Sequence, residues 1–96
     1  MDHKTNIQEL KDTAKKFCED RDWEKYHVAK DLAIGIITES SELLEHFRFK
    51  SNEEIEDMFK SEEKKAEISE EVADIFYFVL RLAQKYDIDL ATTLKS

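Results

Sequence analysis

The sequence predicts an all-α subunit of the four-helix-bundle type. Its 96 residues contain no proline and a single glycine, and apolar side chains recur at helical spacing along most of the chain. These features favour helices and disfavour strands joined by tight turns. A chain of this length fits a single domain, residues 1–96, with a modest core of its own. We therefore expect oligomerisation to complete the core, in a homodimer or a homotetramer.

Polar residues suited to capping a helix N-terminus divide the chain into five helical segments. These residues are Thr5 (in Thr5-x-x-Gln8), Asp31, Ser51 (in Ser51-x-x-Glu54), Ser61 or Glu62, and Asp87 or Asp89. The longer helices are expected to end near residues 20–22, Phe49 and Tyr86. Residues 21–30 show no clean period, so they are expected to form an irregular connection.

The bulk charge and the cysteine content exclude several classes of protein. The formal net charge is −8, and no basic face of the kind that binds nucleic acid is visible. Cys18 is the single cysteine, so the chain has no internal disulfide framework. The N-terminus lacks the apolar stretch of a signal peptide, and no apolar run reaches the roughly 18–20 residues of a membrane span. We expect a cytoplasmic protein without a membrane or nucleic-acid partner.

Carboxylates interrupt two stripes that are otherwise apolar. At helical spacing, the stripes are Leu32-Ile36-Glu39-Leu43 and Glu71-Ile75-Phe78-Leu82. Glu39 and Glu71 occupy positions where leucine or isoleucine would fit. Glu42 and Asp74 each follow three residues later, so each helix carries an acidic pair leaning toward its buried face.

Two facing pairs of buried carboxylates need a cation. A buried carboxylate without a partner costs several kcal/mol or stays protonated, and neighbouring carboxylates repel one another. Hard oxygen ligands with no thiolate and no converging histidine favour Mg²⁺, with Mn²⁺ as a substitute, over Zn²⁺. A di-iron site would need two Glu-x-x-His motifs, and only Glu24-x-x-His27 occurs. Either acidic pair taken alone is more typical of a solvated helix face.

These residues resemble a known family. Glu39-Ser-Ser-Glu42, 28 intervening residues and Glu71-Val-Ala-Asp74 resemble the ExxE…ExxD signature of MazG-like nucleotide pyrophosphohydrolases. The preceding segment, FCEDRDWEKYH at residues 17–27, is similar to the corresponding segment of the branch that prefers dCTP and related pyrimidine deoxynucleotides. The resemblance runs from about residue 7 to residue 94.

The resemblance implies an all-α fold, a dimer or dimer of dimers, and dependence on Mg²⁺. It implies metal ligands at Glu39, Glu42, Glu71 and Asp74. It also implies substrate-binding residues, which are Trp23, His27, Phe49 and Phe78. Relatives often carry Trp and Tyr at the last two positions, where phenylalanine keeps the ability to stack.

The implied reaction is hydrolysis of (deoxy)nucleoside triphosphates to monophosphate and pyrophosphate. Pyrimidine substrates such as dCTP are expected, in a role of nucleotide-pool cleaning. Glu39 or Glu42 would be the catalytic base that orients the attacking water. The alternative is a non-enzymatic, acidic helical module for oligomerisation or protein interaction, in which the same acids face solvent.

Overall fold

The computed structural model describes residues 1–23 and 28–96, and within them every regular element is a helix. The helices are α1 (Ile7–Asp20), α2 (Ala29–Phe47), α3 (Asn52–Met58), α4 (Glu62–Lys85) and α5 (Leu90–Lys95). The prediction of an all-α fold is confirmed. None of the helices in these two ranges combines the length and apolar character that a bilayer span requires.

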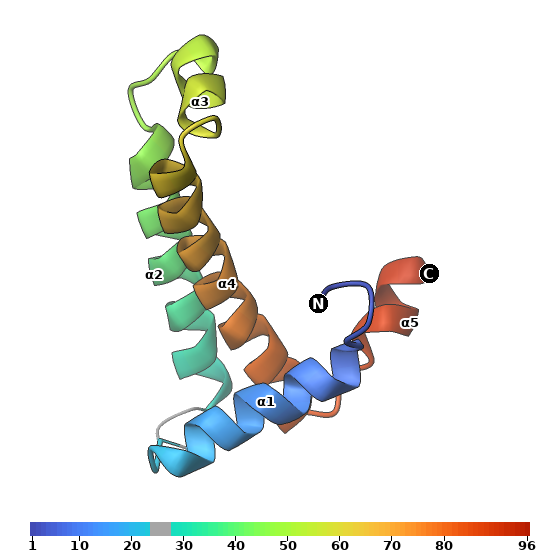
Figure 1. Cartoon of the computed structure of the whole chain (residues 1–96). Helices are drawn as coiled ribbons and strands as arrows, with labels where there is room; N and C mark the ends of the chain where they lie inside the picture. The colour runs from blue at the N-terminus through green and yellow to red at the C-terminus, as the bar shows by residue number, and fades with distance from the viewer. Residues whose placement is uncertain (24–27) are drawn as a thin grey trace.

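The two longest helices form an antiparallel pair. Figure 1 shows α2 and α4 side by side and running in opposite directions, with α3 at one end of the pair. At the other end α1 crosses and packs against α4, and the short α5 and both termini lie on that side. One chain therefore supplies two long helices of a bundle, and the four-helix arrangement with a shared core stays a prediction.

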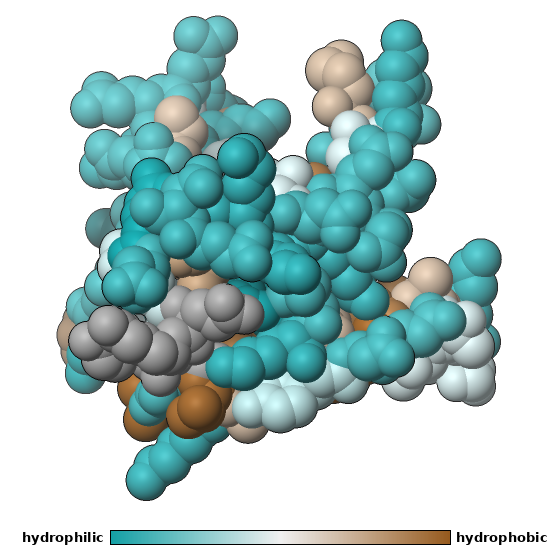
Figure 2. All heavy atoms as spheres, turned by 90° about the horizontal axis from the view of Figure 1, so that it is seen from below, coloured by the Kyte–Doolittle hydropathy of each residue, from teal (hydrophilic) through white to brown (hydrophobic). Residues whose placement is uncertain are grey.

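The buried core within one chain is small. Its buried apolar side chains, among the described residues, are Ala14, Cys18, Leu32, Ile68, Leu80 and Ala83. Most of them lie where α4 meets α2 or α1. Seen from the side of α1, the surface is mostly hydrophilic with small apolar patches (Figure 2).

One side of the α2–α4 pair carries large apolar side chains that the chain itself leaves uncovered. On α2, Ile37 is 71% exposed and Leu44 57%, and on α4, Val72 is 50% and Phe76 39% exposed. Around the axis of each helix, these residues are rotated in the same direction away from the residues that contact the other helix. Because the helices are antiparallel, they share one side of the pair. We call these four residues the apolar face.

Helix starts correct two sequence predictions. Asn6, rather than Thr5, caps α1, because its side chain accepts a hydrogen bond from the Glu9 N–H at 2.8 Å. Asp31 does not cap α2 but lies in its first turn, and the capping position is held by Val28. The remaining predicted caps are confirmed as Ser51, Ser61 and Asp89.

A tyrosine from the end of α4 replaces the missing cap of α2. The Val28 side chain makes no capping hydrogen bond, and the Ala29 N–H donates to the Tyr86 hydroxyl at 2.9 Å. An uncapped helix N-terminus leaves backbone donors unsatisfied, so this bond both satisfies one donor and ties α2 to α4.

The end of α2 lies two residues earlier than predicted. The helix ends at Phe47, and the Lys50 N–H donates to the Phe47 carbonyl at 3.1 Å across a tight turn. Phe49 occupies the left-handed region of this turn at φ 66°, a position that favours glycine or asparagine. Its side chain is 92% exposed.

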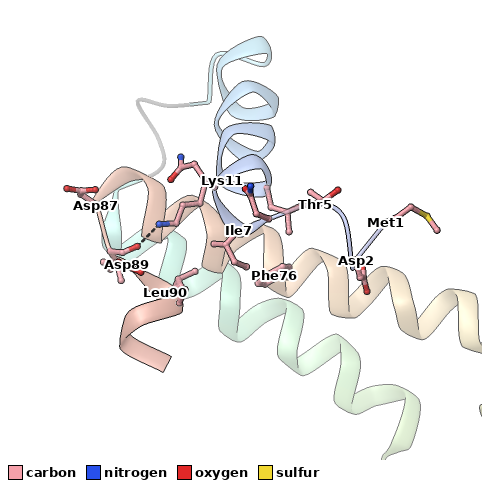
Figure 3. A pocket seen from close by; sticks show the side chains of 14 residues that line it. Met1, Asp2, Thr5, Ile7, Lys11, Phe76, Asp87, Asp89 and Leu90 are labelled. Atoms are coloured by element: carbon pink, nitrogen blue, oxygen red, sulfur yellow. Dashed lines mark hydrogen bonds between the residues drawn. The ribbon is translucent and has the colours of Figure 1, made fainter. Parts of the chain in front are cut away.

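A buried lysine fixes α1 to the connection between α4 and α5. Lys11 is 8% exposed, and its ammonium donates to the Ile88 carbonyl at 2.6 Å (Figure 3). The Thr92 N–H and hydroxyl bond the Asp89 carboxylate at the start of α5, which lowers its pKa, and the nearby Lys11 lowers it further. This contact holds the crossing of α1 over α4 in place.

Candidate functional site

Three carboxylates from the two long helices converge on one point. Glu39 and Glu42 come from α2 and Glu71 comes from α4, and one oxygen of each lies within 4.8 Å of the others. The i, i+3 spacing on α2 places its two acids on neighbouring turns, and antiparallel packing brings Glu71 opposite them. We call this group the carboxylate cluster.

The electrostatics of the cluster are unfavourable without a cation. Burial raises the pKa of Glu39, and the Glu42 charge and hydrogen bond raise it further. Burial and then Glu42 likewise raise the pKa of Glu71. One oxygen of each, Glu39 Oε2 and Glu71 Oε2, is buried and makes no hydrogen bond within the described residues. Buried carboxylate oxygens normally have partners, so these two are suited to an external ligand.

Asp74 lies beside the cluster and does not belong to its closest set. Its charge contributes to the raised pKa of both Glu39 and Glu71, and it lines a cavity together with Glu39. The structure thus brings three of the four predicted metal ligands into one group, with the fourth adjacent.

The donor set fits a hard divalent cation. Carboxylate oxygens are the preferred ligands of Mg²⁺ and Mn²⁺, and the two unpartnered buried oxygens supply positions for coordination. A cation there would offset the mutual repulsion of the three acids. Metal binding by these residues remains a prediction that this chemistry supports.

A histidine also approaches the cluster, which the sequence analysis did not expect. His46 Nε2 lies 4.0 Å from Glu71 Oε1, and the two side chains are 21% and 22% exposed. His46 follows Glu42 by four residues on α2, so helical spacing contained a signal that was missed.

An aromatic cavity of about 380 Å³ opens beside the acids. Its lining among the described residues consists of Phe17, Trp23, Glu39, Asp74, Tyr77 and Phe78. Such a volume falls within the range of small-molecule sites, which are mostly apolar with a few polar groups. The cavity therefore places aromatic rings directly next to two of the predicted metal ligands.

The end of α1 positions Trp23 at this cavity. Asp22 adopts the left-handed conformation at φ 54°, and the Trp23 N–H donates back to the Cys18 carbonyl at 3.1 Å. This pairing, with the Asp22 N–H bonded to the Glu19 carbonyl, is the Schellman arrangement that ends many helices. It turns the chain so that the Trp23 ring meets Phe17 edge to face, with centroids 5.7 Å apart.

The opposite wall depends on the single glycine. A Cβ atom placed on Gly35 would lie 2.6 Å from Phe78 Cε1, well inside van der Waals contact. Gly35 on α2 thus leaves room for the Phe78 ring of α4 to lie directly against the helix backbone. This close approach sets the position of one wall of the cavity.

The predicted substrate-binding residues do not all meet here. Trp23 and Phe78 line the cavity, whereas Phe49 is exposed in the turn after α2 and does not line it. His27 lies outside the described residues. The substrate roles of all four stay predictions.

Phe17 and Tyr77 are cavity residues that the sequence analysis did not single out as site residues. The Tyr77 hydroxyl is buried and makes no hydrogen bond within the described residues. Burial raises its pKa, and the neighbouring Cys18 thiol raises it further. Tyr77 follows Asp74 by three residues, which was its only sequence signal. Phe17 opens the segment of residues 17–27 that resembles the family, and this was its sequence signal.

A larger cavity of about 910 Å³ lies elsewhere, between the N-terminal residues, the start of α1 and the turn into α5 (Figure 3). None of the predicted site residues lines it, over the part of the chain that is described. Its buried cation, Lys11, already bonds the Ile88 carbonyl. The chemistry that the sequence predicts belongs to the smaller cavity.

Comparison with known proteins agrees with this geometry. A family model described as phosphoribosyl-ATP pyrophosphohydrolase matches residues 4–96, nearly the whole chain. The chain belongs to this family. The family lies within the MazG-like superfamily, so the resemblance inferred from the ExxE…ExxD motif is confirmed.

Individual relatives point the same way. The fold is similar to that of a pyrophosphatase from Archaeoglobus fulgidus, whose crystal structure matches with a TM-score of 0.84 and 34% identity. That match covers 93% of this chain and 82% of the other. The chain is also similar to dCTP pyrophosphatase 1 of Bos taurus, 30% identical over 84 residues, and of Homo sapiens, 27% identical over 90 residues.

The chain spans about half the length of these curated relatives. The match covers 88% of this chain and 50% of the bovine protein, and 94% of this chain and 53% of the human protein.

Proposed function

We propose that this chain hydrolyses nucleoside triphosphates to monophosphate and pyrophosphate, with Mg²⁺ or Mn²⁺ held by the carboxylate cluster. The observation that carries the proposal is the convergence of Glu39, Glu42 and Glu71 within 4.8 Å beside an aromatic cavity. A site for a nucleoside triphosphate needs carboxylates that can hold a divalent cation for the phosphates, and aromatic rings on which the base can stack. The family and its named relatives support the same reaction.

The residues divide the substrate between two regions. Phe78 and Trp23 would hold the base by stacking, while the cluster beside them would bind the phosphates through the metal. Bound there, Mg²⁺ supplies charge that polarises the α-phosphate and lowers the pKa of water. Glu39 or Glu42 would orient the attacking water and accept its proton. The water oxygen bonds to the α-phosphorus, the bond to the β-phosphate oxygen breaks, and pyrophosphate leaves.

The substrate class proposed is pyrimidine deoxynucleotides such as dCTP, in nucleotide-pool cleaning in the cytoplasm. Two similar mammalian proteins carry the name dCTP pyrophosphatase 1. A cavity of about 380 Å³ lies at the small end of the range of small-molecule sites, which suits a small pyrimidine base. Measuring hydrolysis of a panel of nucleoside triphosphates would determine which base is preferred.

The apolar face supports self-association. Ile37, Leu44, Val72 and Phe76 are large apolar residues that are exposed within one chain, and apolar residues gathered on one face often mark an interaction site. A second copy that applies its own α2–α4 pair to this face would complete a four-helix core. A homotetramer would need a further surface.

Pyrophosphate release tests the proposal. We expect release from dCTP with Mg²⁺, strongly reduced in Glu42→Gln. The matched control is Glu45→Gln, because Glu45 lies on the same helix but pairs with Arg48 at 3.1 Å on an exposed surface. Equal release by the wild type and Glu42→Gln would contradict the catalytic role of the cluster.

The rival function, a non-enzymatic acidic interaction module, gives a different result. It predicts no turnover of any nucleotide and no specific stabilisation by Mg²⁺. The proposed function predicts that Mg²⁺ at about a hundred times its dissociation constant stabilises the fold by about 2.7 kcal/mol. In a chain of this size that corresponds to a rise in melting temperature of about 10–20 °C.

A further inference from the structure

His46 occupies a position from which it contacts one ligand of the cluster without joining it. It lies one turn beyond Glu42 on α2, and its Nε2 is 4.0 Å from Glu71 Oε1. It is not among the three groups whose atoms lie within 4.8 Å of one another. His46 on α2 therefore lies next to Glu71 of α4, outside the carboxylate cluster.

The two oxygens of Glu71 have different surroundings. Oε1 faces His46, while Oε2 is buried and makes no hydrogen bond within the described residues. A side chain that donates a hydrogen bond to Oε1 would leave Oε2 of Glu71 able to bind a cation in the carboxylate cluster.

The His46 side chain is mostly covered by the fold. It is 21% exposed, and its ring centroid lies 6.5 Å from that of Phe47, the next residue on α2. Phe47 in turn stacks on Phe59 in the segment after α3, at 5.9 Å. A ring confined in this way can fix the orientation of a carboxylate, as partners behind metal ligands commonly do.

We propose that His46 is a positioning residue, which donates from Nε2–H to Glu71 Oε1 and so directs Oε2 toward Glu39 and Glu42. This inference rests on the proposed function, because it assumes that the cluster binds a divalent cation. At 4.0 Å the two atoms are farther apart than in a hydrogen bond, so this contact must shorten when the cation binds for the donation to occur. Removing a partner of this kind typically weakens metal binding about 10- to 100-fold.

Two substitutions separate the donor from the packing. His46→Gln keeps an N–H donor near the position of Nε2, whereas His46→Leu keeps an apolar side chain and removes the donor. His3→Leu is the matched control, because His3 is exposed near the N-terminus. The direct measurement is calorimetric titration of each variant with Mg²⁺, repeated with Mn²⁺ by electron paramagnetic resonance of the free ion.

The expected result is that His46→Leu binds Mg²⁺ about 10- to 100-fold more weakly, while His46→Gln stays close to the wild type. Pyrophosphate release by His46→Leu should recover at high Mg²⁺, which a general structural defect would not allow. If the wild type binds Mg²⁺ and His46→Leu binds it equally well, or if both variants weaken alike, the positioning role is overturned and the proposed function stands. If the wild type binds no Mg²⁺, the proposed function fails and this role fails with it.

Discussion

Truncating Ile37 on the apolar face distinguishes a solitary chain from an assembly. Ile37 is 71% exposed, so less than a third of its side chain is covered within one chain. A fully buried aliphatic side chain such as Leu32, which is 0% exposed, costs about 2–5 kcal/mol when cut to alanine. If this cost scales with the covered fraction of the side chain, Ile37→Ala costs about 0.6–1.5 kcal/mol in a single chain. In an assembly that buries the apolar face it costs about 2–5 kcal/mol per subunit.

Urea unfolding at two protein concentrations measures the difference, with light scattering to give the mass. We expect the larger cost for Ile37→Ala, a lower mass, and a wild-type unfolding midpoint that rises with protein concentration. Leu94→Ala is the control, because Leu94 on α5 is 88% exposed and lies away from the face. A cost near 1 kcal/mol together with a midpoint independent of concentration would refute a core shared through the apolar face.

Two further predictions concern helix capping and pH. Tyr86→Phe removes the acceptor of the Ala29 N–H, so it should lower the free energy of unfolding, measured in urea, by about 0.5–1.5 kcal/mol. An unchanged free energy of unfolding would show that this hydrogen bond does not stabilise the fold. Burial raises the pKa of Glu39 above 4.5 in the folded protein, so the folded state holds this proton more tightly than the unfolded chain does. The stabilisation that results is complete below pH 4.5, and it is lost as the pH rises through the pKa of the folded protein. Without metal, Glu39→Gln should therefore gain stability relative to the wild type as pH rises from about 4.5 toward 7, and parallel pH profiles would contradict this.

The helical spacing of apolar residues predicts which side chains lie at the contact between helices. Features that depend on tertiary contacts do not follow from this spacing. Glu39 and Glu71 interrupt apolar stripes, so their approach to the contact between two helices follows from spacing alone. The start of α2 does not follow, because its cap is the hydroxyl of Tyr86, 57 residues away from Ala29. Sequence reasoning assigned that role to Asp31, since a local carboxylate is the usual solution.

The candidate site shows the same division. His46 is separated from Glu42 by one helical turn and was predictable in principle, whereas its approach to Glu71 depends on how α2 and α4 align. The exposure of Phe49 depends on a turn in which a phenylalanine adopts φ 66°, a conformation that propensity assigns to glycine. Residues at such positions are poorly predicted because a weak local preference is overruled by the connection between helices.

Gly35 joins the fold to the shape of the candidate nucleotide site. In Gly35→Ala, the new Cβ would meet three ring carbons of Phe78 at 2.6–2.8 Å, so the ring must move. The cavity beside Phe78 is the open space available, and the displaced ring would narrow it. Alanine gains about 1 kcal/mol of helix propensity over glycine, while overpacking costs about 1–3 kcal/mol. The net change in stability is therefore expected to be small, between about zero and a loss of 2 kcal/mol.

The effect on substrate should be larger than the effect on the fold. We expect KM for dCTP to rise by about tenfold with a lesser change in kcat, because the substitution alters the wall of the cavity and leaves the carboxylates in place. The double variant Gly35→Ala with Phe78→Leu removes the clashing ring, so its losses should not equal the sum of the two single variants. Additive losses, or an unchanged KM in Gly35→Ala, would show that the ring and the glycine act independently and that Phe78 does not bound the substrate.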